Sequence, residues 1–145
     1  MRFDTVFVLT SLLGVSDALR RQCKHNPANE GEGWYYTTSI DNADNVAADF
    51  CTKPSIIRQW NNIKGNENVR PGKNLKVPCR QRRRDCKKGS GSTGWYTVES
   101  GDWLSKIAPD FCTDVRGLLE LNPKLKPNPD YIEPGWIVTV PCSWN

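Results

Sequence analysis

The sequence predicts an α+β protein built from two copies of a small strand–helix–helix–strand module. Each copy is expected to hold a two-stranded antiparallel sheet with both helices on one face. Three observations support this fold class: an internal repeat, apolar residues at alternating strand and helix spacings, and six cysteines in 145 residues. A chain of this length accommodates one ordinary domain or two small ones. With 37% hydrophobic and 10% aromatic residues, it is not disordered by composition.

The N-terminus has the pattern of a secretory signal peptide over residues 1–18. An apolar run at 5–15 follows a weakly positive start and precedes small residues suited to signal peptidase. No other apolar run is long enough to cross a bilayer. We therefore expect a secreted, extracellular protein whose mature chain starts at Leu19 and whose cysteines are oxidised. The dibasic pair Arg20-Arg21 is a candidate site for further trimming during export.

The rest of the chain is one unit written twice. Trp34-Tyr35 recurs as Trp95-Tyr96, and the Val-Pro-Cys that ends the first copy recurs at the end of the second. Repeats of this kind mark stacked or tandem structural units. The expected layout is a signal peptide at 1–18, an N-terminal segment at 19–33, module one at 34–79, a linker at 80–94, module two at 95–142 and a tail at 143–145.

The second copy shows the expected elements most clearly. Residues 95–99 are aromatic and β-branched, as strands prefer, and 100–102 form a turn whose Asp102 is placed to cap a helix. Residues 104–111 then carry apolar side chains at helical spacing, and Pro109 predicts that this helix ends early or bends. The inward residues of this helix are Leu104, Ile107, Ala108 and Phe111.

A second helix and a closing strand complete each module. In module two, Thr113 is expected to cap a helix with Val115, Leu118 and Leu119 inward, and 136–140 alternates like a strand. In module one, Asp41 takes the place of Asp102 as the expected cap. The corresponding elements of module one are 36–38, 43–50, 54–60 and 75–77.

The cysteines divide into three for each module, and we expect all three to gather at one end of it. Units of fewer than 50 residues usually need such staples. An odd number for each module requires at least one bridge between modules, and the sequence leaves 15 pairings open. The absence of any CxxC argues against a zinc or thioredoxin-type site, and no metal or cofactor is expected. The cysteines are Cys23, Cys51, Cys79, Cys86, Cys112 and Cys142.

The linker at 80–94 is basic and then rich in Gly, Ser and Thr, which predicts a flexible, solvated connector. A different class of function remains open here, namely binding of a polyanion such as an anionic polysaccharide or a nucleic acid. No aromatic residues interleave with the charges, so the connector is favoured. The basic residues are Arg80, Arg82, Arg83, Arg84, Lys87 and Lys88.

Three runs in the second copy resemble the LysM domain: 96–102 (YTVESGD), 118–123 (LLELNP) and the Pro134-Gly135 that opens the closing strand. Module one resembles it less closely, because 39–41 lacks the turn glycine and Tyr36-Thr37 aligns only with one residue missing. Together with the signal peptide and the added cysteines, the chain is similar to the secreted LysM effectors of fungi.

This resemblance implies a non-enzymatic lectin that binds chitin and other N-acetylglucosamine oligomers. Such a protein is a virulence factor that sequesters chitin fragments or shields hyphal walls from host chitinases and immunity. Cell-wall chitin is then the partner, with no nucleic acid or membrane, and the ligand could induce a dimer or higher assembly. Bacterial peptidoglycan, which also contains N-acetylglucosamine, is the alternative ligand.

The resemblance places the ligand groove between the loop after the first strand and the loop before the closing strand. A neutral N-acetylated sugar needs exposed backbone amides, a few polar groups and one apolar platform. Trp103 could be that platform or could tuck against the core, and the missing glycine in module one predicts unequal affinities. The candidate residues are Ser100, Gly101, Asp102, Trp103, Leu104, Pro129, Asp130, Tyr131 and Ile132 in module two, and Ser39, Ile40, Asp41, Asn42, Asn66, Glu67, Asn68 and Val69 in module one.

The other tryptophans and the acidic residues receive less specific interpretations. Trp34, Trp60 and Trp95 are expected to pack in the core or at strand ends, and Trp136 suits either role. Catalysis is not expected, because no pair of carboxylates stands in a recognisable hydrolase setting. His25, the single histidine, lies outside both modules without a partner for nucleophilic catalysis.

Overall fold

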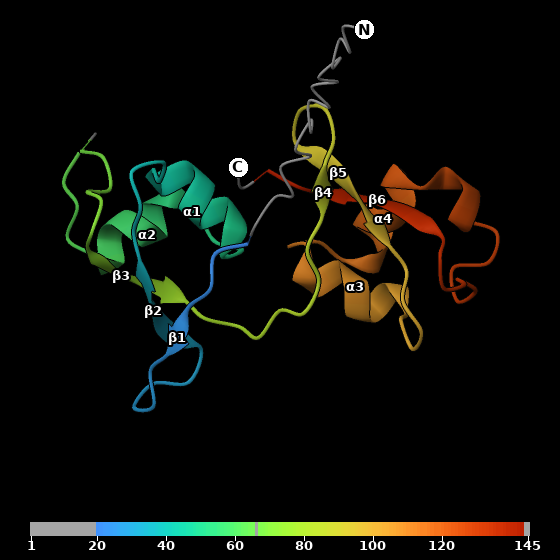
Figure 1. The fold of residues 1–145 in the computed structure, drawn as a ribbon, viewed down its shortest axis with the longest axis horizontal. Helices are drawn as coiled ribbons and strands as arrows, with labels where there is room; N and C mark the ends of the chain where they lie inside the picture. The colour runs from blue at the N-terminus through green and yellow to red at the C-terminus, as the bar shows by residue number, and fades with distance from the viewer. Residues whose placement is uncertain (1–19, 66, 144–145) are drawn as a thin grey trace, which may run out of the picture.

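The computed structural model describes residues 20–65 and 67–143. The predicted signal peptide at 1–18, the predicted start at Leu19 and the candidate residue Asn66 lie outside the described residues. The two modules lie side by side along the long axis of the molecule (Figure 1). Among the residues described, no helix is long and apolar enough to cross a membrane.

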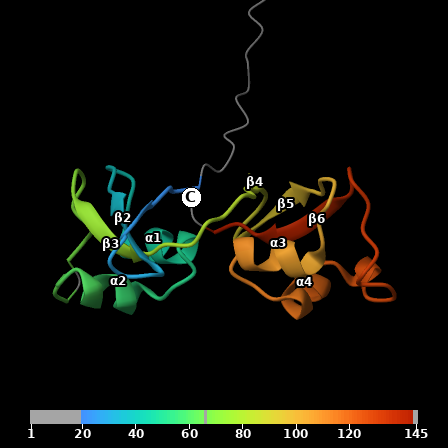
Figure 2. The same cartoon turned by 90° about the horizontal axis from the view of Figure 1, so that it is seen from below.

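Module one is a three-stranded antiparallel sheet with two helices on one face. The strand order is β1-β2-β3, and Tyr35 of β2 pairs with Leu75 of β3. Both helices lie on the same side of the sheet (Figure 2), which confirms the predicted layering. The elements are β1 (Lys24–His25), β2 (Glu32–Tyr36), α1 (Ala43–Asp49), α2 (Pro54–Trp60) and β3 (Asn74–Pro78).

Module two repeats this arrangement, so the predicted α+β fold class is confirmed. Its strand order is β4-β5-β6, and Tyr96 of β5 pairs with Val138 of β6. One extra 3-10 turn, η1 (Pro123–Leu125), occupies the longer connection of this copy. The elements are β4 (Lys87–Lys88), β5 (Thr93–Thr97), α3 (Leu104–Asp110), α4 (Val115–Leu121) and β6 (Ile137–Pro141).

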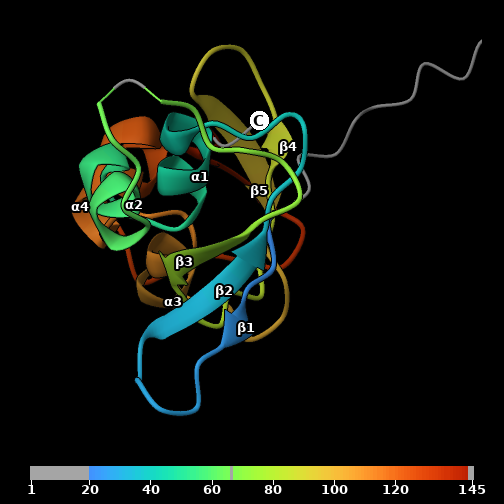
Figure 3. The same cartoon turned by 90° about the vertical axis from the view of Figure 1, so that its left-hand side faces the viewer.

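The prediction of two-stranded sheets was incomplete, because a short leading strand adds to each sheet. Lys24 pairs with Trp34 in module one, and Lys87 pairs with Trp95 in module two. Each leading strand directly follows a cysteine that is bonded to the cysteine after the closing strand. The disulfide therefore fixes the incoming chain to the end of the sheet, and β1 lies beside β2 in the side view of module one (Figure 3).

Strand alternation decides which aromatic residues are buried. Tyr35 and Tyr96 face the helices and are buried, whereas Trp34 and Trp95 face outward and are 42% and 40% exposed. Of the two predicted placements for these tryptophans, the core or the strand ends, the core is therefore wrong. Tyr35 and Tyr96 occupy equivalent places in their sheets. The first strands of the two modules therefore align without the missing residue that the alignment of Tyr36-Thr37 required.

The helices bury the predicted faces but are capped differently from the prediction. Leu104, Ile107, Ala108 and Phe111 all lie in the core of module two. The N-caps are Asn42 for α1, Trp103 for α3 and Asp114 for α4. Asp41, Asp102 and Thr113, predicted as caps, each precede the true cap by one residue, and the two carboxylates have other partners.

The disulfides confirm the prediction of at least one bridge between the modules. Cys23 pairs with Cys79 and Cys86 with Cys142 within the modules, while Cys51 and Cys112 join the two modules. Gly33 shows how closely a staple approaches the sheet, since a Cβ there would lie 2.5 Å from the Cβ of Cys79. Glycine is therefore required where the staple crosses the strand.

The basic linker is not the flexible connector that its composition predicts. Arg82 and Arg84 are partly buried and form ion pairs with Asp49 and Asp102. Close carboxylates favour a fixed arginine geometry over free hydration, because the guanidinium fork matches the two carboxylate oxygens. Of the basic residues in this segment, Arg82 and Arg84 are therefore engaged in ion pairs, whereas the others are exposed to solvent.

Candidate functional site

The predicted groove loops lie at opposite outer ends of the molecule. In Figure 1 the loop after α2 lies at the far left and the loop after α4 at the far right, while the loop after β2 lies at the top of module one and the loop after β5 at the bottom of module two. Backbone hydrogen bonds join the two loops of each site. The Val98 amide donates to the Trp136 carbonyl at 2.8 Å, and the Thr37 amide donates to the Lys73 carbonyl at 2.9 Å.

In module two, the turn after β5 closes on the carboxylate of Asp102. Asp102 Oδ2 accepts from the Tyr96 hydroxyl at 2.7 Å and from the Glu99 amide at 2.9 Å, while Oδ1 accepts from Arg84 Nε at 3.0 Å. Burial opposes ionisation here, but these hydrogen bonds outweigh it and hold the pKa of Asp102 below its usual value. Asp102 is therefore an ionised internal brace of the turn.

Asp41 closes the equivalent turn of module one. Its Oδ2 accepts from the Tyr35 hydroxyl and the Thr38 amide, both at 2.7 Å, and its Oδ1 accepts from Arg21 Nε at 2.8 Å. Burial raises the pKa of Asp41, but the hydrogen bonds from Thr38, Tyr35 and Arg21 lower it by a larger amount. The pKa of Asp41 therefore lies below its usual value. The same brace thus recurs although the two turn sequences differ.

The bracing tyrosines make the stability of the protein sensitive to alkali. Burial, followed by the hydrogen bond to Asp41, raises the pKa of Tyr35 from its usual 10.0 to about 12. A phenol whose pKa is raised by folding contributes its stabilisation fully below the unfolded value and loses it as pH rises through the folded value. We expect the free energy of unfolding in urea to fall between pH 10 and about 12.

Two phenylalanine substitutions test this pH dependence. Tyr35→Phe should remove part of the alkaline loss, whereas Tyr36→Phe, at an exposed residue of the same strand, should leave it in place. A decline already complete below pH 10.0 would contradict the assignment.

Module two presents an exposed aromatic surface at its loops. Trp103 is 51% exposed beside the open turn, which favours the predicted platform over the alternative of a side chain tucked into the core. On the other loop Tyr131 is also 51% exposed and meets Trp136 edge to face, with ring centroids 5.7 Å apart. The Tyr131 hydroxyl donates to Glu133 and so has a fixed direction.

The remaining candidates of module two divide into exposed and buried groups. Ser100, Gly101 and Asp130 are exposed, and Pro129 is half-buried. Leu104 lies in the core, and Ile132 packs against it from the loop, so these two side chains shape the site from beneath. Their role as ligand contacts stays a prediction.

Module one offers a different surface at the same place. Ser39, Ile40 and Asn42 are exposed, as are Glu67 and Asn68 on the facing loop. Asp41 and Val69 are buried, so neither side chain is presented to solvent.

The two turns also differ in backbone shape and in their caps. Gly101 adopts a φ of 85°, which favours glycine, whereas its counterpart Ile40 is not in this left-handed region. Asn42 caps α1 through a reciprocal capping box with Asn45, but Trp103 makes no side-chain hydrogen bond to α3. Module two thus has a glycine turn, and an aromatic residue where module one has a stabilising cap.

The arginines that support the turns were missed by sequence reasoning. We assigned Arg21 to a processing site and Arg84 to a solvated linker, yet each holds the carboxylate of a turn. A signal was present, because Arg21 and Arg84 each stand two residues before a cysteine, Cys23 and Cys86. The repeated unit therefore begins with Arg-x-Cys rather than with Trp-Tyr.

Comparison with known proteins agrees with the geometry of both modules. Residues 36–78 and 96–141 match the family model of the LysM domain, and together they make up more than half of the chain. The chain belongs to the LysM family. The match covers both β-α-α-β units, including the module whose turn glycine is missing.

Relatives of the LysM protein include fungal effectors and bacterial wall enzymes. The secreted LysM effector Vd2LysM of Verticillium dahliae is 43% identical over 149 residues, which is 100% of both chains. The secreted LysM effector ECP6 of Passalora fulva is 43% identical over 51 residues, covering 35% of this chain and 22% of that protein. An autolysin of Enterococcus faecalis is 30% identical over 98 residues, 63% of this chain but 13% of the autolysin.

These matches support carbohydrate binding by the LysM protein and relate it to proteins named as secreted effectors. LysM is a binding domain, and the relative that matches along its whole length is named as a secreted effector. An N-acetylmuramoyl-L-alanine amidase of Staphylococcus epidermidis also matches, but the similarity covers only 29% of that enzyme.

Proposed function

We propose that this protein binds chitin oligomers through their N-acetylglucosamine units, at the turn and facing loop of each module. The observation that supports this best is Trp103, half-exposed beside Gly101, whose backbone has a positive φ. An indole face suits the apolar face of a sugar ring, and free amides of the turn suit its acetamido group. The ligand carries no charge, so its recognition would rest on the indole face and on hydrogen bonds rather than on ion pairs.

The placement of the loops gives the proposed binding a bridging geometry. The two loop pairs lie at opposite ends of the molecule, and the Cys51–Cys112 disulfide fixes the modules to each other (Figure 1). Two sites that face apart engage separate chitin chains more readily than one short oligomer. The protein would thereby gather fragments, coat hyphal walls and form ligand-dependent assemblies, which is the role of an effector that hides chitin from a host.

A pull-down separates this function from its alternatives. The secreted protein is incubated with chitin, cellulose and bacterial peptidoglycan at low and high salt, and the retained fraction is measured. We expect retention on chitin that salt does not change, because contacts to a neutral ligand are nearly insensitive to screening. Greater retention on peptidoglycan would favour the bacterial ligand, and elution from chitin by salt would contradict the proposal.

The polyanion alternative loses support from the structure. Arg82 and Arg84 are engaged with Asp49 and Asp102, so two of the charges that suggested it are already neutralised locally. The other basic residues of the segment, Arg80, Arg83, Lys87 and Lys88, are exposed.

A further inference from the structure

In each module a single arginine side chain connects the candidate binding turn to the far end of the first long helix. Arg84 Nε lies 3.0 Å from Asp102 Oδ1, and its Nη1 lies 2.8 Å from Asp110 Oδ2 at the end of α3. Arg21 repeats this geometry in module one, with Nε 2.8 Å from Asp41 Oδ1 and Nη1 3.5 Å from Asp49 Oδ2.

These contacts are largely closed to water. The Arg21 and Asp41 side chains are 5% and 0% exposed, and those of Arg84 and Asp102 are 15% and 5% exposed. Charge-assisted hydrogen bonds are stronger in such surroundings, and leaving one partner unpaired is correspondingly costly. A guanidinium reaches two carboxylates at once because its donors form a planar fork, which a lysine ammonium lacks.

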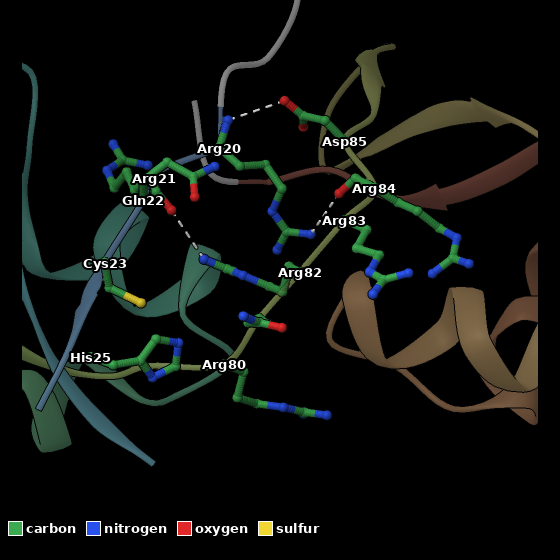
Figure 4. Close-up of a pocket in the computed structure, with 11 residues that line it drawn as sticks. Arg20, Arg21, Gln22, Cys23, His25, Arg80, Arg82, Arg83, Arg84 and Asp85 are labelled. Carbon is green, nitrogen blue, oxygen red and sulfur yellow. Dashed lines mark hydrogen bonds between the residues drawn. The ribbon is translucent and has the colours of Figure 1, made fainter. Parts of the chain in front are cut away.

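The two arginines are themselves held across the boundary between the modules. Arg82 Nη2 donates to the Arg21 carbonyl at 3.2 Å, and Arg20 Nη1 donates to the Arg84 carbonyl at 3.4 Å (Figure 4). Arg20 and Arg82 also both contact Asp49 Oδ1, at 3.1 Å and 3.0 Å. Arg20 thus supports Arg84, and Arg82 supports Arg21.

We propose that Arg21 and Arg84 are positioning residues that hold the two glycan-binding turns in their binding shape by anchoring them to the interface between the modules. The inference rests on the proposed function of those turns. Neither arginine touches the glycan. Each acts through the carboxylate that fastens its own turn, so each controls the affinity of its own module.

Module-resolved binding tests the proposal. Labelled protein is titrated with the hexamer of N-acetylglucosamine, and NMR shifts are followed at the Ser39 and Ile40 amides for module one and at Ser100 and Gly101 for module two. Arg84→Ala should weaken binding at module two by about tenfold, because one charged hydrogen bond that holds its turn is lost. Binding at module one should be unchanged. Arg21→Ala should give the reverse pattern.

A neighbouring arginine provides the matched control. Arg83→Ala removes the same charge one residue away, but the Arg83 side chain is exposed, so both affinities should stay at the wild-type value. Arg84→Lys keeps the charge and loses the fork, and it should fall between the wild type and Arg84→Ala. Intact mass and spectral dispersion confirm that each variant has formed its disulfides and folded.

The outcomes distinguish this inference from the proposed function. A wild-type protein that shifts neither turn would refute glycan binding itself. A wild type that binds, with Arg84→Ala binding equally well or losing affinity equally at both modules, would overturn the positioning role. If Arg84→Ala does not fold, Arg84→Lys carries the test, and unchanged affinity at module two in that variant would also overturn it.

Discussion

Replacing Asp49 by alanine should destabilise the protein by about 3–5 kcal/mol, the usual cost of removing one partner from a buried ion pair. Asp49 is fully buried at the end of α1. Its carboxylate accepts from the Arg21 amide at 2.7 Å and pairs with Arg20 and Arg82 at 3.1 Å and 3.0 Å. Without it, three guanidinium groups would share a buried site whose main counter-ion is missing.

The matched control is Asp44→Ala in the first turn of the same helix. Asp44 is exposed, so its loss should cost less than about 1 kcal/mol, the ordinary size of a charge effect at a helix end. Both variants are compared with the wild type by urea unfolding with the disulfides intact. A loss in Asp49→Ala no larger than that in Asp44→Ala would show that the arginines find adequate partners elsewhere.

The interface illustrates what the sequence could predict and what it could not. The odd number of cysteines in each module predicted a bridge between modules, and Cys51–Cys112 is that bridge. The ionic contacts were not predicted, because Arg20 is far from Asp49 along the chain and ion-pair partners leave no periodic pattern. An acidic residue at the C-terminal end of a helix opposes the helix dipole, and Asp49 and Asp110 both stand there. That unfavourable placement was the available sign of a cationic partner.

The candidate site stays a prediction, but the structure changes the roles of two of its residues. The groove loops follow from the element order, and the exposure of Trp103 agrees with the predicted platform. The roles of Asp41 and Asp102 were assigned from local sequence alone, since an acidic residue before a helix usually caps it. In the folded protein a tyrosine hydroxyl binds one oxygen of each carboxylate and an arginine binds the other, and these tertiary partners hold it away from the helix end.

Trp103→Asn should stabilise the protein while weakening glycan binding at module two. Trp103 occupies the N-cap of α3 without a side-chain hydrogen bond, whereas Asn42 at the equivalent place accepts from the Asn45 amide at 2.8 Å. Restoring a capping side chain should add about 0.5–2 kcal/mol to the free energy of unfolding. The loss of roughly 1.5 kcal/mol of indole contact with a sugar should lower affinity about tenfold.

The control for the second effect is Trp95→Asn on the outer face of the sheet. Trp95 is 40% exposed, so it offers a similar area of indole away from the loops. Affinity for the N-acetylglucosamine hexamer, measured by calorimetry, should be unchanged in Trp95→Asn. Full affinity in Trp103→Asn would remove Trp103 as the platform, and an unchanged free energy of unfolding would show that asparagine does not cap α3.

Opposite signs in the two measurements would have a specific meaning for this site. An exposed aromatic residue that weakens the start of a helix has no structural benefit in the fold, because module one forms the same helix with a proper cap. Function is then the reason for the residue, and the stability lost at α3 is the cost of the exposed indole. Module one has α1 capped by Asn42 and has Ile40 in place of the turn glycine. It would therefore be the more stable and the weaker-binding of the two modules.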